Sequence, residues 1–165
     1  MLTPAQNATL KAAILADQVL AAKPNNSDGN FEIAAAMNTQ AAPDYYVWRT
    51  GVSVDEIMQN GFDWTRVDNL TVGKARIWDW MMRTGTINPS RSNVRAGVLA
   101  VFGVAADLAT RLAVFTHCQR LATRVEKLLV SAGSGTTTTE QGTGPATMGF
   151  EGPINSDQIE TARNS

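Results

Sequence analysis

Cysteine and histidine are almost missing from this chain, in which Cys118 and His117 are the only residues of either type among 165. A single cysteine excludes an internal disulfide, and one residue of each type is too few for a zinc site of recognisable spacing. Neighbouring helix positions point in diverging directions, so we expect a buried Cys118 and a partly exposed His117 rather than a thiolate–imidazole pair. We expect no metal and no cofactor.

Long apolar runs are missing as well. No uninterrupted stretch approaches the roughly 18 residues that a membrane span needs, and the first residues lack a basic segment followed by an apolar one, the mark of a secretory signal. We expect a protein made in the cytoplasm, with no membrane contact. Strand signals are few, and 44% of the residues are apolar, which suits one core and an extension.

Helix start signals are frequent. Residues 3–6 and 53–56 have the order of capping boxes, and Thr71 and the pair Asn88-Pro89 are further expected starts. These signals predict a mainly α fold, a helical bundle of five to six helices over residues 1–132. The expected helices include one running to Ala22, one over 31–37 with Phe31 facing inward, and the longest over 104–130, where Thr123 could cap a restart.

The end of the chain departs from the helical pattern. Residues 131–145 consist mainly of Gly, Ser and Thr, which lose more entropy on ordering than burial returns. We expect a flexible linker at 133–145 and a docking arm at 146–165, made of a short strand and a short helix. Such an arm would become ordered by binding another molecule, through Met148, Phe150, Ile154, Ile159 and Arg163.

Charge is distributed unevenly around a net value of −1. Residues 1–73 have four basic and eight acidic side chains, residues 74–127 have nine and three, and residues 128–165 have one and four. Two interpretations stay open: solvated helix faces, or surfaces that meet in an assembly or line a passage for a polyanion. The arginines that could face DNA or a neighbouring subunit are Arg83, Arg91, Arg95, Arg111, Arg120 and Arg124.

Aromatic residues and arginines gather in the centre of the sequence, and these types are common at interface hot spots. Trp78 and Trp80 lie two apart on an expected helix, so at least one of them should be exposed. We therefore select as candidate protein-interface residues Trp48, Arg49, Trp64, Arg66 and Trp80, together with the five residues of the arm.

The sequence offers little that predicts an enzyme. Asp55 and Glu56 could form an acid–base pair, but both fall in the first turn of a capped helix, where carboxylates stabilise the helix dipole. The Gly- and Thr-rich run is not followed by the Gly-Lys-Ser/Thr of a phosphate-binding loop. We expect no catalytic residues.

Two central segments carry a family resemblance: YVWRTGVSVDEIMQNGFDWTRVDNL at 46–70 and KARIWDWM at 74–81. Together with TMGFEG at 147–152 and IETAR at 159–163, they resemble small virion proteins of tailed bacteriophages. A helical body with a C-terminal arm further resembles head-to-tail connector subunits, also called adaptor or head-completion proteins.

The resemblance implies a structural protein at the neck of the virion. Connector subunits form a homo-oligomeric ring, on the order of twelve copies by analogy, which joins the portal protein to neck and tail proteins. Such a ring lines the DNA passage and contacts viral DNA transiently and without sequence preference.

The same residues permit other roles. A tail-terminator or tail-completion protein and a head-decoration protein are alternatives within the virion. A DNA-binding regulator is the alternative outside it, which the near-neutral charge and the lack of a helix-turn-helix pattern disfavour.

Overall fold

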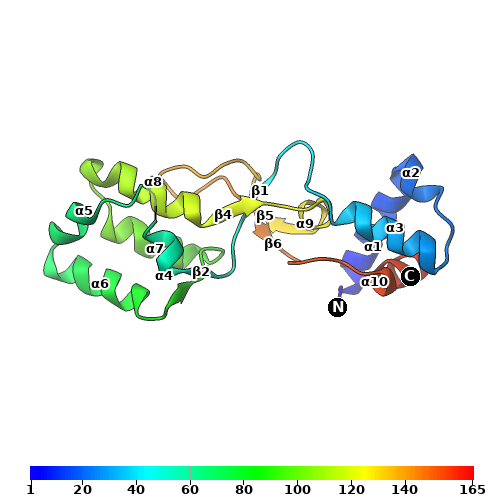
Figure 1. The fold of residues 1–165 in the computed structure, drawn as a ribbon, viewed down its shortest axis with the longest axis horizontal. Coiled ribbons are helices and arrows are strands. Elements are labelled where there is room, and N and C mark those ends of the chain that lie inside the picture. Colours follow the sequence, from blue (N-terminus) through cyan, green and yellow to red (C-terminus); the bar gives the residue numbers. More distant parts are fainter. Residues whose placement is uncertain (60) are drawn as a thin grey trace. The chain divides into compact units, whose positions relative to one another are not determined.

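A computed structural model describes residues 1–59 and 61–165. The chain forms two compact units: unit 1 contains Met1–Tyr45, Leu121–Ala132 and Met148–Ser165, and unit 2 contains Tyr46–Arg120 and Gly133–Thr147. The described residues form ten α-helices and a few short strands (Figure 1). The mainly α prediction is confirmed, but two units replace the single bundle of five to six helices over 1–132.

Unit 1 is built from three separate stretches of sequence. Its helices are α1 (Pro4–Ala16), α2 (Gln18–Ala21), α3 (Ser27–Met37), α9 (Arg124–Leu128) and α10 (Ser156–Asn164). A short strand, β5 (Val130–Ala132), pairs with β6 (Thr147–Met148), of which Met148 belongs to this unit. The core is aliphatic and includes Leu10, Ile14, Ile33, Val125 and Ile159.

The first helices of unit 1 begin and end where local hydrogen bonds dictate. The predicted capping box of Thr3 and Gln6 is present. The helix expected to reach Ala22 breaks at Asp17, whose backbone is extended and whose carboxylate accepts the amide hydrogens of Val19 and Leu20. Helix α3 begins four residues before the predicted start, and Phe31 is 68% exposed, so the prediction that it faces inward was wrong.

The C-terminal residues have the predicted strand and helix but a different destination. Helix α10 packs against α1 and α3 (Figure 1, red beside blue), and Ile154 and Ile159 are buried in the core of unit 1. The Asn38 side chain bonds the backbone N–H and carbonyl of Ile154, each at 2.8 Å. Because its own chain covers these residues, the prediction that the arm at 146–165 needs another molecule was wrong.

Unit 2 contains the central part of the sequence. Its elements are β1 (Tyr46–Trp48), β2 (Val52–Ser53), α4 (Val54–Ile57), α5 (Trp64–Asp68), α6 (Val72–Met82), β3 (Thr86–Ile87), α7 (Ser92–Val101), the 3₁₀ turn η1 (Ala105–Asp107) and α8 (Leu108–His117). Strand β2 pairs antiparallel with β3, with Val52 opposite Ile87. The core is rich in aromatic residues, namely Trp48, Phe62, Trp78, Phe102 and Phe115.

The long helix predicted over 104–130 is interrupted. Helix α8 ends at His117, and strand β4 (Gln119–Leu121), which pairs with β1, follows it. The Arg49 amide bonds the carbonyl of Cys118 at 2.9 Å, and the Ala122 amide bonds the carbonyl of Tyr45 at 2.8 Å. These distant backbone partners extend the chain, and the predicted Thr123 cap then starts α9.

The segment 133–145, predicted as a flexible linker, is held within unit 2 and runs alongside α8 (Figure 1, orange). The Tyr46 amide donates to the carbonyl of Gly135 at 2.8 Å, and Arg111 Nε donates to the carbonyl of Glu140 at 2.6 Å. Gly142 has a φ of +66°, and a Cβ there would lie 2.7 Å from the Phe115 ring. Specific partners, rather than its composition, order this segment.

Candidate interaction surface

Helix α6 presents one tryptophan to the core and one to solvent. Thr71 caps the helix, as predicted, by accepting the amide hydrogen of Lys74. The Trp78 ring stacks on Phe62 with 5.7 Å between ring centroids and meets Phe102 edge-on at 4.9 Å. Trp80, two residues further, is 80% exposed. The prediction that at least one of this pair is exposed is confirmed.

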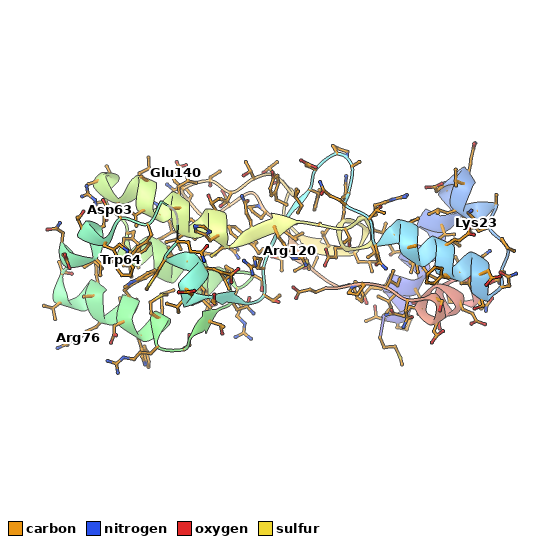
Figure 2. The ribbon with its side chains drawn as sticks, in the orientation of Figure 1. Lys23, Asp63, Trp64, Arg76, Arg120 and Glu140 are labelled. Carbon is orange, nitrogen blue, oxygen red and sulfur yellow. The ribbon has the colours of Figure 1, made fainter. Side chains whose placement is uncertain are left out.

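Four further exposed side chains surround Trp80 on the outer side of α6. We call this set the α6 face; its members are Val72, Arg76, Ile77, Trp80 and Arg83. Arg83 Nη2 lies 2.8 Å from Asp79 Oδ2, whereas Arg76 makes no ion pair with any residue in the described part of the chain. Figure 2 shows the Arg76 side chain directed away from its helix.

The α6 face is slightly hollowed. An open pocket of about 350 Å³ is lined by Arg76, Ile77, Asp79, Trp80 and Arg83. An indole and two guanidinium groups around such a hollow can pack against an apolar side chain while attracting carboxylates or phosphates. Apart from Trp80 and Arg83, the sequence prediction missed this face, although the helical spacing of 72, 76, 80 and 83 marks it.

A second tryptophan of unit 2 is also partly exposed. Trp64 begins α5 and packs edge-on against Phe62 at 5.0 Å, while 55% of it remains exposed. Asp63 caps this helix, and hydrogen bonds from the hydroxyl and amide of Thr65 lower the pKa of its carboxyl. Arg66 lies 3.5 Å from the same carboxyl. Of these candidates, Trp64 remains available to a partner.

Two other interface candidates contact residues of their own unit. Trp48 is buried, and the Arg95 guanidinium lies 4.9 Å from its ring centroid. Arg49 Nη1 lies 2.8 Å from Glu56 Oε1, and this contact, together with hydrogen bonds from Ser53, lowers the pKa of Glu56 to about 2. The prediction that Trp48 meets a partner was wrong, because its own chain covers the ring.

The five candidates of the arm belong to unit 1. Ile154 and Ile159 are core residues, Phe150 packs against that core, and Met148 is half-buried. Arg163 donates hydrogen bonds to the carbonyls of Pro24 and Lys23 and to the Asn30 side chain. The structure therefore uses these residues for internal packing.

The arginines predicted to face DNA or a neighbour do not form one set. Three of them bind partners in their own unit: Arg95 donates to the Pro89 carbonyl, Arg111 is buried and donates to the Phe102 carbonyl, and Arg124 pairs with Asp17 at 2.9 Å. Arg120 is half-buried, and Arg83 and Arg91 are exposed. For half of the set, a channel-lining role gives way to internal packing.

The reactive groups considered in the sequence have structural surroundings in unit 2. Cys118 is buried as predicted, and burial raises the pKa of its thiol to about 12, so it stays protonated at neutral pH. Glu56 completes the capping box of α4, as its sequence position indicates. Within residues 1–59 and 61–165, no three His, Cys, Asp or Glu side chains are placed to share a metal ion.

Comparisons with protein-family models, with curated proteins and with solved structures find no match for this chain. In the described ranges no single helix has the length and hydropathy to cross a membrane; the bent pair Ser92–Val101 and Ala105–His117, at 115° to each other, meets those two criteria together. The geometry of the α6 face therefore carries the functional argument.

Proposed function

We propose that this protein is a structural subunit of a tailed-bacteriophage virion, a head-to-tail connector that joins the portal to the tail and lines the DNA passage. The observation that carries the proposal is the α6 face, where Trp80 is exposed between Arg76 and Arg83. An exposed tryptophan flanked by arginines has the composition of an interface hot spot. The resemblance of residues 46–70 and 74–81 to phage virion proteins supports the same role.

The internal packing of the chain is compatible with this role. A subunit that completes both cores from its own residues needs only surface contacts to assemble, and a ring needs two different complementary surfaces on each copy. The α6 face supplies one of them. A tail-completion or head-decoration role would use the same surface in another part of the particle.

Mass spectrometry of purified particles, followed by analysis of separated heads and tails, tests the proposal. We expect the chain in particles and in the fraction that contains the portal. Trp80→Ala with Arg76→Glu should abolish incorporation, while Val19→Ser, a change at an exposed apolar residue of unit 1, should not. Absence of the chain from purified particles would contradict the proposal, and recovery with the tails alone would favour the tail-completion role.

A further inference from the structure

Helix α3 of unit 1 carries an exposed surface that, like the α6 face, has an aromatic residue among charged ones, but of the opposite charge. Asp28, Phe31, Glu32 and Ala35 are exposed on it, and we call this set the α3 face. Phe31 lies three residues after Asp28 and one before Glu32, so an aromatic ring stands among carboxylates. Glu32 pairs with Lys23, whereas Asp28 makes no ion pair with a residue in the described ranges.

We propose that the α6 face of one copy binds the α3 face of a second copy. This inference rests on the proposed function in treating the α6 face as an assembly surface, and it names the occupant. Trp80 would pack beside Phe31 of the second copy, with Arg76 and Arg83 opposite Asp28 and Glu32. Aromatic anchors ringed by complementary charges are the usual composition of a specific contact.

The charges of the two units support this choice of occupant. Unit 1 has five basic and eight acidic side chains, and unit 2 has nine and seven. The acidic unit of one copy therefore attracts the basic unit of another. Because the two faces differ, each bound copy keeps one unoccupied face for the next, which generates a ring or a filament.

DNA is a weaker candidate for the α6 face. Phosphates need cations alone, whereas this face exposes Trp80, Ile77 and Val72 and has Asp79 beside Arg83. Apolar side chains and a carboxylate gain nothing from a phosphate backbone. A protein surface with an exposed ring and acidic groups satisfies all of them.

Charge reversal of the full chain tests the contact. Variant A has Arg76→Glu and Arg83→Glu, and variant B has Asp28→Lys and Glu32→Lys. Two copies of A would place acidic faces together, and two copies of B would place basic faces together. In an equal mixture every contact between A and B is complementary, because the reversed α6 face of A meets the reversed α3 face of B, and the unchanged α6 face of B meets the unchanged α3 face of A.

Sedimentation velocity in low salt, over a range of concentrations, gives the readout. We expect the wild-type chain to self-associate, each variant to be at least about tenfold weaker, and the equal mixture to recover wild-type association. A monomeric wild-type chain, a mixture no more associated than either variant, or duplex DNA binding by a monomer that variant A loses would each overturn the inference.

Cross-linking provides a test that survives a folding defect in variant B. Phe31 and Trp80 are highly exposed, and Cys118 is buried and does not compete. Under oxidation, chains with Phe31→Cys and chains with Trp80→Cys should form a mixed disulfide dimer. Leu15→Cys, at another exposed apolar residue of unit 1, serves as the control with Trp80→Cys. Equal yields for the two pairs would overturn the inference.

The outcomes separate this inference from the proposed function. If the chain is absent from purified particles but A and B associate only as a mixture, the virion role fails and the contact stands. If the chain is present in particles but A, B and their mixture behave alike, the contact fails and the virion role stands.

Discussion

The two units differ in the residue types of their cores and in the parts of the sequence that form them. Unit 1 has an aliphatic core drawn from three stretches of sequence that include the C-terminus, whereas unit 2 has an aromatic core drawn mainly from one continuous stretch. Unit 1 therefore depends on residues at the far end of the chain. Unit 2 depends on a few large aromatic rings. Helix α6, which contributes Trp78 to this core, also carries the exposed Trp80.

Removal of residues 151–165 should have the largest effect and tests whether unit 1 depends on the end of the chain while unit 2 does not. Ile154, Ile159 and Ala162 leave the core of unit 1, and the two isoleucines alone account for about 3–6 kcal/mol of burial. Since whole domains are stable by about 5–15 kcal/mol, we expect unit 1 to unfold and unit 2 to stay folded. Amide exchange should show lost protection in α1 and α3 and retained protection in α6 and α7.

A single substitution refines the truncation result. Ile159 is 0% exposed and Glu160 is exposed. Ile159→Ala should lower the free energy of unfolding by about 2–5 kcal/mol, and Glu160→Ala by less than about 0.5 kcal/mol. Equal effects in urea denaturation, or undiminished protection of α1 and α3 after truncation, would mean that the C-terminus does not complete unit 1.

The next largest effect is expected from a comparison of two tryptophan substitutions in α6. Trp78→Ala should cost about 3–5 kcal/mol because it empties a space between Phe62 and Phe102. Trp80→Ala should change the stability of the monomer by less than about 0.5 kcal/mol because its ring faces solvent. Thermal denaturation of dilute protein measures both changes. A large loss for Trp80→Ala would show that its ring packs within the monomer.

The segment 133–145 allows a smaller test of how unit 2 orders a glycine-rich chain. Gly142→Ala places a Cβ against the Phe115 ring and forces a positive φ on alanine, so we expect a loss of about 1–3 kcal/mol. Gly51 has open space around it and no positive φ, and Gly51→Ala is the control, with no loss of stability expected. Similar denaturation midpoints for the two variants would contradict the packing of this segment on α8.

The smallest expected effect concerns pH. The pKa of Glu56 is lowered to about 2 by Arg49 and by the Ser53 amide and hydroxyl. A lowered pKa in the folded state gives a stabilisation that is present above the unfolded value of about 4.5 and is lost as pH falls toward 2. Glu56→Gln keeps a capping-box residue but should flatten the stability profile of unit 2 between these values.

Arg49→Met provides the companion measurement, because it removes the cationic partner and leaves the carboxyl. The same part of the pH profile should become shallower. Denaturation midpoints at pH 2.5, 4 and 6 measure both effects, and an unchanged slope in both variants would exclude the Arg49–Glu56 pair as a source of acid sensitivity.

Local signals in the sequence predicted local structure. The capping boxes of Thr3 with Gln6 and of Ser53 with Glu56 form as expected, and Thr71 caps α6. Each of these caps is formed by residues three positions apart, so a short stretch of sequence contains both hydrogen-bonding partners. The same holds for Trp78 and Trp80, whose opposite orientations follow from helical geometry.

The failures share one physical cause, which is a partner far away in the sequence. Residues near Cys118 are extended because the Arg49 amide bonds the Cys118 carbonyl, and Ile159 is buried because α1 and α3 cover it. The glycine-rich segment is ordered by contacts such as that of Arg111 with the Glu140 carbonyl. Amino-acid composition and hydrophobic periodicity do not indicate these contacts.

The candidate site was likewise predictable only where it depends on local helical geometry. Helical spacing identifies the exposed ring of Trp80, but it does not separate Arg83, which stays exposed, from Arg95 and Arg111, which bind carbonyls within unit 2. That distinction depends on which loops lie beside each guanidinium. The sequence therefore indicated the types of residue in the contact and only part of its location.

Amide hydrogen exchange of the wild-type chain at low and high protein concentration tests the central claim most directly. We predict that α10 is protected to the same degree at both concentrations, because the chain itself buries Ile154 and Ile159, while α3 and α6 gain protection as copies associate. Protection of α10 that develops only at high concentration, with α3 and α6 unchanged, would contradict the account.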